Sequence, residues 1–355
     1  MAHRRYTYKI SSRVQSNSKR YCVKTMKVLS LFDGISCAYE GCVRAGIDVK
    51  EYYACEIDKN AIKVSQSRHP DIIRPTNDVR ELIGTMVPEI DLLIGGSPCQ
   101  DLSIAKKDRK GLSGDRSGLF WEYVRILKEV KPKYFILENV ASMPKADRDI
   151  ITKEMGVEPV MFNASLVSAQ MRKRLFWTNI SFELPADRGI VLKDILQPDV
   201  DNCFFLNKQL QANSNTERKQ RTMVKVGYIG DGEQYGQGGQ AHRVYDPSGK
   251  TPTLSSYAPL IKVGHIGNSN SQGNRVYSPD GKSPTLSANG GGLGAKTGLY
   301  KIEEKIRKLT PIECERLQGL PDDYTAGISN TQRYKCLGNA FNVEVVATIV
   351  KNIVA

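Results

Sequence analysis

The sequence predicts an α/β fold, in which a doubly wound open sheet is joined to a smaller β-rich lobe. Three observations predict it. A strand, a glycine turn and a helix follow one another over residues 27–46, and a second strand at 52–58 ends in acidic residues. An apolar run at 90–94 leads into Gly95-Gly96-Ser97-Pro98-Cys99-Gln100. Between 227 and 298 the composition shifts to Gly, Ser, Asn and Gln. Open α/β sheets bind ligands at the carboxyl ends of their strands, so we expect the site at that edge.

Composition limits the class of protein. The chain has 355 residues, enough for one large domain or two unequal ones. A net charge of +13 favours a polyanionic partner such as nucleic acid, although simple solubility is the alternative. The eight cysteines show no C-x-x-C pair, which argues against a zinc site or a disulfide framework and suits a reducing cytosol. No apolar run approaches the ~20 residues of a membrane span. We therefore expect a cytoplasmic monomer that needs neither a metal nor a membrane.

The N-terminal residues 1–25 are basic and contain no acidic residue. This composition predicts a disordered, solvated arm that adds non-specific affinity for phosphates. The first predicted strand, 27–32, follows directly. The arm is therefore set apart from a folded part that begins at residue 26.

The first half of the folded part carries features of a nucleoside site. The turn Asp33-Gly34-Ile35-Ser36 lies between a strand and a helix, where backbone N–H groups can meet a ligand. Glu56 ends the next strand about 20 residues later, a spacing that suits hydrogen bonds to ribose hydroxyls. Asp78 supplies a further acid after another strand-end turn. A surface acid at a strand end is the alternative for each, but together the features favour a nucleoside ligand.

Cys99 is the candidate nucleophile, because a thiolate at a strand's carboxyl end can attack an electrophilic ligand. The alternative is a small buried cysteine in a turn. The loop that follows, residues 105–118, is basic and rich in glycine. After a predicted helix at 120–131, the strand 134–140 ends in Glu138-Asn139. A carboxylate at a buried strand end costs free energy unless it is paired or functional.

Gln170-Met171-Arg172-Lys173-Arg174 has the form Gln-x-Arg-x-Arg on an expected strand. Alternate residues of a strand share a face, so Arg172 and Arg174 should point together and Lys173 away. A solvent-facing basic triplet is the alternative.

The central region contains an internal repeat. Residues 226–230 recur as 263–267, and residues 243–254 recur as 275–286. Each copy predicts a short strand, a Pro–Gly turn and a short strand, so we expect stacked β-units. Arg243 and Arg275 are candidates for contact with base edges, but as repeated residues they suit a structural role equally well.

The C-terminal part contains two further motifs. Residues 307–320 include a Thr cap, a Pro and a Glu that predict a helix. Residues 334–341 include Gly338-Asn339, which predicts a turn before a closing helix at 343–353.

In this order the motifs resemble those of DNA cytosine-5 methyltransferases, over residues 26–180 and 299–355. The residues around Cys99 and Arg174 are similar to the catalytic domain of the vertebrate de novo enzymes, whereas the recognition region looks microbial or phage-like. The resemblance implies a Rossmann-like, S-adenosylmethionine-dependent methyltransferase fold. It assigns 26–180 to the catalytic domain, 181–298 to a β-rich target-recognition domain and 299–355 to a returning segment. The turn at 33–36 lacks a second glycine that many members have, a departure that leaves the cofactor assignment intact.

The resemblance also implies roles for individual residues. Cys99 would add to C6 of a cytosine flipped out of double-stranded DNA, and Glu138 and Arg174 would hold and polarise the ring, with Arg172 in support. C5 would then take the methyl group of S-adenosylmethionine, leaving S-adenosylhomocysteine. The cofactor pocket would comprise Phe32, Asp33, Gly34, Ile35, Glu56, Ile57, Asp78, Val79, Pro98, Leu119, Asn339 and Ala340. DNA contacts would come from Ser103, Lys106, Arg109, Arg116, Arg243 and Arg275.

Two other functions are alternatives. A tRNA cytosine-5 methyltransferase would share these motifs, but the long lobe at 181–298 argues against it. A silent DNA-binding homologue is disfavoured by the presence of Cys99, Glu138 and Arg174 together.

Overall fold

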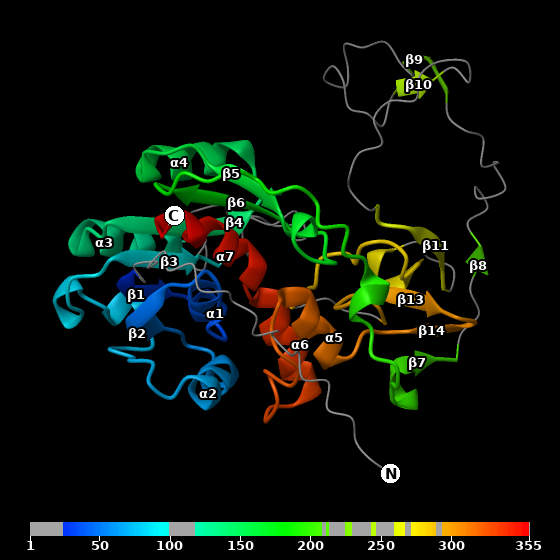
Figure 1. Cartoon of the computed structure of the whole chain (residues 1–355), viewed down its shortest axis with the longest axis horizontal. Helices are drawn as coiled ribbons and strands as arrows, with labels where there is room; N and C mark the ends of the chain where they lie inside the picture. The colour runs from blue at the N-terminus through cyan, green and yellow to red at the C-terminus, as the bar shows by residue number, and fades with distance from the viewer. Residues whose placement is uncertain are drawn as a thin grey trace, which may run out of the picture.

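A computed structural model describes residues 24–98, 118–207, 259–266, 271–288 and 293–354, and the backbone of three short strands at 211–212, 224–228 and 243–245. Two six-stranded sheets organise this part of the chain, and helices connect and cover them (Figure 1). Of the predicted site residues, Cys99, Ser103, Lys106, Arg109 and Arg116 lie outside the described residues, as do residues 1–23 of the expected arm.

The first sheet has the order β2-β1-β3-β4-β6-β5. Strands β1 (Thr25–Leu31), β2 (Asp48–Cys55), β3 (Leu92–Gly96) and β4 (Tyr134–Val140) are parallel, and β6 (Lys173–Thr178) runs antiparallel to β4 and to β5 (Val160–Asn163). Because β2 and β3 lie on opposite sides of β1, the chain reverses its direction of winding there. Such a switch point leaves a crevice at the carboxyl ends of the strands.

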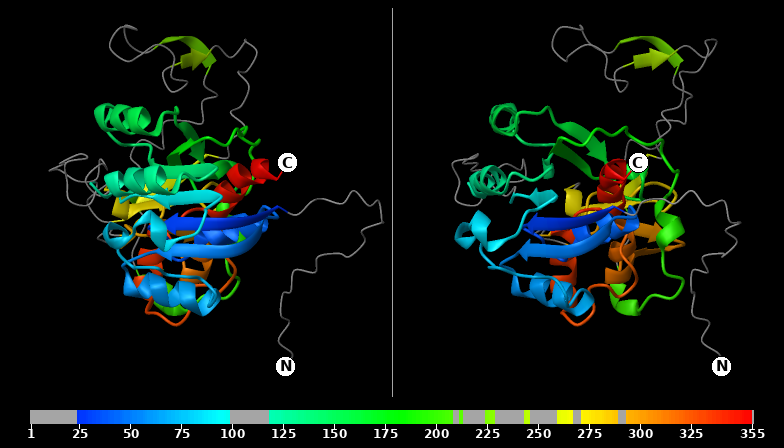
Figure 2. Two further views of the ribbon diagram at one scale, coloured as in Figure 1. Left: turned by 90° about the vertical axis from the view of Figure 1, so that its left-hand side faces the viewer. Right: turned by 60° about the vertical axis from the view of Figure 1, so that its left-hand side comes forward.

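Helices cover both faces of this sheet, which confirms the predicted α/β architecture. Strand residues alternate between two apolar clusters: Val28 packs with α1 (Cys37–Arg44) and α7 (Val343–Val350), whereas Leu29 packs with α3 (Leu119–Val130) and α4 (Lys145–Met155). The C-terminal helix α7 thus returns to the first strands, as both views of Figure 2 show. None of the described helices is long and apolar enough to cross a bilayer.

The second sheet has the order β7-β14-β13-β12-β11-β8. It comprises β7 (Phe205–Leu206), β8 (Gln211–Ala212), β11 (Lys262–His265), β12 (Arg275–Tyr277), β13 (Leu299–Ile302) and β14 (Lys305–Arg307). Strand β13 pairs in parallel with β12, and β14 pairs with β13 and β7. The sheet therefore extends across residue 298, where the recognition lobe was expected to end.

The internal repeat appears as two hairpins with equivalent register. Strand β9 (Val224–Tyr228) pairs with β10 (Arg243–Tyr245), so that Arg243 lies opposite Tyr228. In the second copy β11 pairs with β12, so that Arg275 lies opposite His265. Arg275 and His265 occupy the repeat positions of Arg243 and Tyr228. The two copies therefore share a hairpin register as well as a sequence. The rest of the first copy, 246–254, lies outside the described residues.

Three more helices complete the described chain: α2 (Lys59–Arg68), α5 (Pro311–Gln318) and α6 (Asn330–Asn339). The predicted cap of α5 is present, because the Thr310 hydroxyl accepts from the Glu313 N–H and the Glu313 carboxylate accepts from the Thr310 N–H. The predicted turn at Gly338-Asn339 is wrong, since these residues form the last turn of α6. A Cβ on Gly338 would lie 2.4 Å from the Ala288 nitrogen, so this glycine serves close packing of the helix against the recognition lobe.

Candidate active site

A cavity of about 250 Å³ opens at the carboxyl ends of the parallel strands. Its described lining comes from segments that are far apart in sequence, as expected for an α/β switch point. These residues are Phe32, Gly34, Cys55, Glu56, Ile57, Asp58, Ala61, Asn77, Asp78, Val79, Arg80, Gly96, Ser97, Pro98, Leu119, Glu138, Val140, Arg172, Arg174, Cys336, Gly338 and Asn339. The cavity thus brings together most of the described residues that the sequence predicted for cofactor and base.

The turn after β1 is held in an unusual backbone conformation. Phe32, Gly34 and Ser36 all have φ close to +60°. For the two residues with side chains this region costs roughly 1–3 kcal/mol each. The surrounding contacts must stabilise it, and they are centred on Asp33.

Asp33 points into the protein and does not line the cavity. Its carboxylate accepts hydrogen bonds from the Ser36 hydroxyl at 2.6 Å and from the Tyr52 hydroxyl at 2.8 Å, and Arg74 lies 3.7 Å away. Burial raises the pKa of the Asp33 carboxyl, and the two hydroxyl donors oppose that rise. Ile35 is also buried in the core. These two predicted cofactor residues therefore support the turn from behind.

Glu56 organises the second strand end. One carboxylate oxygen accepts from the Gly34 N–H at 2.8 Å, and the other accepts from the N–H groups of Ile57 and Asp58 at 2.9 and 2.8 Å. Burial raises the pKa of this carboxyl, and the backbone donors oppose the rise. The Ile57 side chain is 66% exposed at the rim of the cavity, where it offers apolar surface to a ligand.

Asp78 lies at the cavity edge in a fork formed by Arg80. The Arg80 Nε lies 3.0 and 3.1 Å from the two carboxylate oxygens, and Nη2 lies 2.5 Å from the second. These hydrogen bonds lower the pKa of Asp78 below its ordinary value. Arg80 itself is largely exposed, so its side chain can move away without leaving a buried group unpaired.

At the other end of the cavity, Glu138 and Arg174 form an ion pair. The Arg174 Nε lies 2.6 Å from the Glu138 Oε1, and their side chains are 16% and 12% exposed. Strand pairing brings them together, because β6 runs antiparallel to β4 and places Arg174 opposite Val140. A partly desolvated carboxylate–guanidinium pair can donate to and accept from the edge of one planar ring.

Gly96 makes room for the Glu138 carboxylate. A Cβ at this position would lie 2.9 Å from the Glu138 Oε2 and 2.9 Å from the Phe341 ring. A Cβ at Gly95 would instead meet the Leu31 carbonyl at 2.9 Å and the Tyr123 ring at 3.1 Å. The two glycines thus face opposite sides of β3, and only Gly96 faces the candidate site.

Arg172 and Asn139 hold neighbouring segments in place. The Arg172 Nη2 donates to the carbonyls of Gly338 and Ala340 at 3.2 and 2.9 Å, which ties the arginine strand to the returning segment. The Asn139 amide donates to the Ser97 hydroxyl at 3.1 Å, which fixes the chain two residues before Cys99. Ala340 is buried and offers the site only its carbonyl, although the sequence predicted a cofactor contact.

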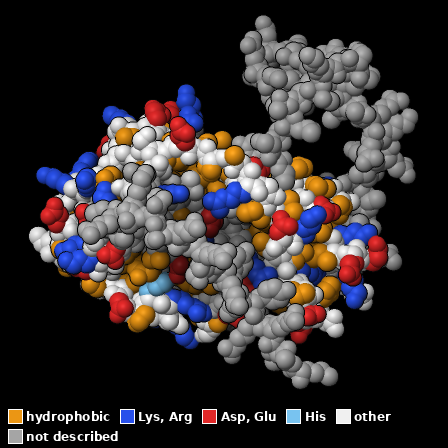
Figure 3. Space-filling view, viewed as in Figure 1, with side chains coloured by type: hydrophobic (Ala, Val, Ile, Leu, Met, Phe, Trp, Pro, Cys, Tyr) orange, Lys and Arg blue, Asp and Glu red, His pale blue; other side chains and the backbone are white. Residues whose placement is uncertain are grey.

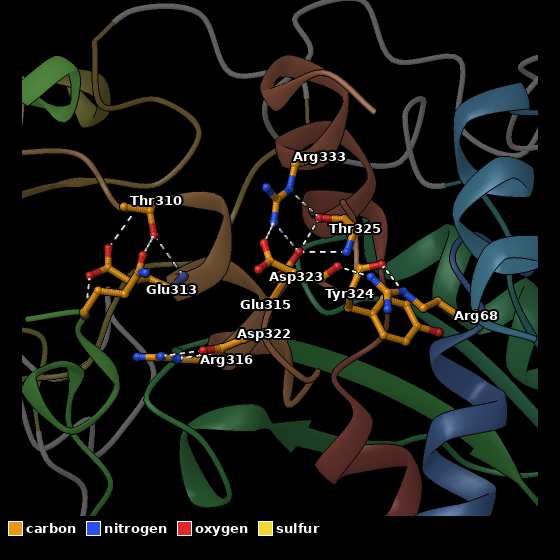
Figure 4. Close-up of polar contacts among 11 residues, drawn as sticks. Arg68, Thr310, Glu313, Glu315, Arg316, Asp322, Asp323, Tyr324, Thr325 and Arg333 are labelled. Carbon is orange, nitrogen blue, oxygen red and sulfur yellow. Dashed lines mark hydrogen bonds and ion pairs between the residues drawn. The ribbon is translucent and has the colours of Figure 1, made fainter. Parts of the chain in front are cut away.

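The returning segment closes the remaining side of the cavity. The Lys335 Nζ lies 2.6 Å from the Asp58 Oδ2, which joins α6 to the start of α2. Figure 4 shows the bracing behind it, with Arg333 directed at Glu315 and Thr325, and Arg68 directed at the backbone of the Tyr324 segment. Tyr324 in turn donates through its hydroxyl to the Ile35 carbonyl at 2.9 Å, beneath the cofactor turn.

Sequence reasoning missed several lining residues, notably Asp58, Arg80, Asn77 and Cys336. Asp58 follows Glu56 by two residues, and Arg80 follows Asp78 by two residues. This proximity to predicted site residues was the sequence feature that could have indicated them. Neither Asn77 nor Cys336 belongs to a pattern that would single it out. Among the described residues, no group of three or more His, Cys, Asp or Glu side chains is arranged to hold a metal ion.

Of the residues predicted to contact DNA, the structure describes Arg243 and Arg275. For Arg243 the structure gives only its backbone in β10, and Arg275 lies on β12 next to β11. On the face shown in Figure 3, lysine and arginine side chains are interspersed with acidic ones. The described part of that face therefore shows no single basic patch.

Comparison with known proteins identifies the family. The family model of C-5 cytosine-specific DNA methylases matches residues 26–355. The type II methyltransferase M.HhaI of Haemophilus parahaemolyticus is 30% identical over 85% of this chain and 86% of its own length. The orphan methyltransferase M.SPRI of Bacillus phage SPR is 27% identical over 93% and 97%.

Solved structures agree on the fold. The Entamoeba histolytica methyltransferase EhMeth superposes with a TM-score of 0.62 at 13% identity, over 93% of this chain and 98% of its own. Spodoptera frugiperda DNMT2 superposes with a TM-score of 0.61 at 17% identity, over 92% and 99%. The sequence and the fold lead to the same conclusion: the chain belongs to the family of C-5 cytosine-specific DNA methylases and is a DNA cytosine-5-methyltransferase.

Proposed function

We propose that this enzyme transfers a methyl group from S-adenosylmethionine to C5 of a cytosine in a specific double-stranded DNA sequence, through a covalent adduct between Cys99 and C6. One observation carries the proposal. The Glu138–Arg174 pair and the acidic and apolar groups suited to a nucleoside line the same cavity. Pro98, to which Cys99 is bonded, lines it as well.

The lining fits S-adenosylmethionine chemically. This cofactor supplies an electrophilic methyl group on a sulfonium centre. Phe32 and Ile57 would pack against the adenine, Glu56 would accept from the ribose hydroxyls, and Asp78 would accept from the adenine amino group once Arg80 moves aside. Gly34, Val79 and Leu119 would complete the walls, and Asn339 would lie near the methionine part. A nucleoside presents an apolar ring, an amino group and sugar hydroxyls. The apolar side chains and the two carboxylates of the cavity match these groups.

The chain's own groups would activate the cytosine. C6 is a poor electrophile until positive charge develops at N3. Glu138 in its protonated form would therefore give its proton to N3 and take it back when the thiolate leaves, and Arg174 would donate to O2. The Cys99 thiolate would form the S–C6 bond while the C5=C6 electrons move to C5. C5 would then take the methyl group as the bond from that group to the sulfonium sulfur breaks, which would leave S-adenosylhomocysteine. Loss of the C5 proton to a base would return the electron pair to C5=C6 and expel the Cys99 thiolate.

The substrate base must leave the stack to reach this cavity. We propose that the loop carrying Ser103, Lys106, Arg109 and Arg116 contacts DNA phosphates beside the flipped base. We also propose that the lobe at 181–298, including Arg243 and Arg275, contacts the recognition sequence. The basic loop and the polar, repeated lobe support these assignments.

Trapping the adduct tests the mechanism directly. In DNA that contains 5-fluorocytosine, the methylated adduct has no C5 proton to lose, so the S–C6 bond should persist. Mass spectrometry of the digested complex should then find a methylated fluorocytosine nucleotide on the Cys99 peptide. The Cys99→Ala variant should form no adduct. An adduct on another cysteine, or active wild-type enzyme that never traps, would contradict the proposed chemistry.

A further inference from the structure

The second repeat copy contacts the backbone that leads into the two site arginines. The contact is made by residues 282–285, the docking segment, and by residues 169–174, the arginine segment. The Ser283 N–H donates to the Ala169 carbonyl at 2.7 Å, and the Met171 N–H donates to the Ser283 carbonyl at 2.8 Å. The Thr285 hydroxyl donates to the Met171 carbonyl at 2.5 Å. Both backbone groups of Met171 are therefore bonded to the recognition lobe.

Lys282 anchors the docking segment in the catalytic domain. Its side chain is fully buried, and Nζ donates to the carbonyls of Ser165 and Ser168 at 2.7 and 3.1 Å. It also lies 3.1 Å from the Asp187 Oδ1. An ammonium has three donors, and these three acceptors match them, as a buried charge requires. The segment is thus fixed by side-chain as well as backbone contacts.

The arginine segment also has contacts on the side that faces away from the docking segment. The Arg172 N–H donates to the Asn163 side chain at 2.9 Å, and its guanidinium donates to the Ala340 carbonyl. Two residues later, Arg174 pairs with Glu138. A displacement of the Met171 peptide therefore passes directly to Arg172 and, through the start of β6, to Arg174.

We infer that Thr285 is a positioning residue: its hydroxyl sets the placement of the arginine segment, so that the recognition lobe determines where Arg174 meets the target base. This inference rests on the base-holding role of Arg174 in the proposed function. Of the contacts from the docking segment to Met171, the Thr285 hydroxyl is the one that a side-chain substitution removes.

The test compares three substitutions in the full-length enzyme. Thr285→Val removes the hydroxyl with little change of shape, and Thr285→Ser keeps it. Thr297→Val is the matched control, because the buried Thr297 hydroxyl donates to the Gly298 carbonyl at 2.8 Å in the same lobe but does not contact the arginine segment. The measurement is the single-turnover rate of transfer from tritium-labelled S-adenosylmethionine to plasmid DNA. Cofactor affinity and melting temperature are measured alongside.

Thr285→Val should lower the single-turnover rate about ten-fold, because small misplacements of a group that orients the reacting base slow the chemical step. Thr285→Ser and Thr297→Val should remain within about two-fold of wild type, and cofactor affinity should not change. Should Thr285→Val fail to fold, Thr285→Ala carries the same expectation.

Three results would overturn the inference. They are a wild-type rate in Thr285→Val, an equal loss in Thr285→Ser, or an equal loss in Thr297→Val. A wild-type enzyme without activity on DNA would instead count against the proposed function.

Discussion

Substituting Gly96 by alanine should impair catalysis more than it impairs folding. The added Cβ would lie 2.9 Å from the Glu138 Oε2, whereas ordinary contacts begin near 3.4 Å, so the carboxylate must retreat by about 0.5 Å. Catalytic groups must be held within about 0.5 Å of their productive geometry, and a misplacement of about 1 Å can cost 10²-fold. We therefore expect the single-turnover rate of Gly96→Ala to fall about ten- to a hundred-fold, or roughly 1.4 to 2.7 kcal/mol in activation free energy.

Gly95→Ala is the matched control. Its Cβ would meet the Leu31 carbonyl and the Tyr123 ring at 2.9 and 3.1 Å, on the opposite face of the same strand and away from Glu138. Neither glycine has a positive φ, so alanine suits the backbone at both positions. Overpacking should cost each variant about 1–3 kcal/mol of stability. Only Gly96→Ala should also lose transfer rate at a temperature where both are folded.

The assay measures single-turnover methyl transfer and the free energy of unfolding for both variants, and repeats Gly96→Ala in a Glu138→Gln background. If Gly96 acts through Glu138, the second substitution should add little to the first. The reasoning would be refuted by a wild-type rate in Gly96→Ala, by an equal loss of rate in Gly95→Ala, or by fully additive effects with Glu138→Gln.

Three further predictions concern the cofactor end and the lobe contact. Asp78→Ala should weaken binding of S-adenosylmethionine about ten-fold or more, since a charged acceptor is lost; unchanged affinity in calorimetry would argue against its adenine contact. Because Arg80 lowers the pKa of Asp78, that carboxylate stays ionised in mild acid. Its contribution to binding, measured as wild type against Asp78→Ala, should therefore be constant between about pH 8 and pH 5, and a contribution that falls over this range would contradict an ionised Asp78 acceptor. Lys282→Met should lower the free energy of unfolding by about 3–5 kcal/mol in denaturant titrations, because the buried Asp187 carboxylate loses its ammonium partner. Adding Asp187→Leu to Lys282→Met should recover much of this loss. Equal stability of the single and double variants would refute that account.

Local patterns predicted the central strands, because β1, β3 and β4 are short apolar runs bounded by turn residues, whereas β2 begins four residues before the strand predicted at 52–58. The strand at 134–140 matches β4 residue for residue, and the carboxyl-end rule placed Phe32, Glu56, Asp78 and Glu138 around one cavity. The internal repeat predicted a short strand on either side of a Pro–Gly turn in each copy. In the second copy β12 precedes that turn, but no named strand follows it over 282–286, and β12 forms its hairpin with β11 instead.

The parts that could not be predicted depend on contacts between distant segments. Asp33 turns inward because Ser36 and Tyr52 donate to it and because the backbone on either side adopts positive φ. No local pattern encodes that combination. Gly338 ends a helix against the Ala288 backbone, a contact between residues 50 positions apart, where the dipeptide alone suggested a turn. The partner of Arg172 is similarly a pair of carbonyls in the returning segment.

Mapping of 5-methylcytosine in plasmid DNA from cells that express the enzyme tests the central claim most directly. The wild type should methylate cytosine within one defined sequence, and Cys99→Ala, expressed to the same level, should leave that sequence unmodified. Such a result would establish the activity and supply the recognition sequence together. DNA without 5-methylcytosine, from cells that contain folded enzyme able to bind S-adenosylmethionine, would contradict the account and direct attention to methylation of tRNA.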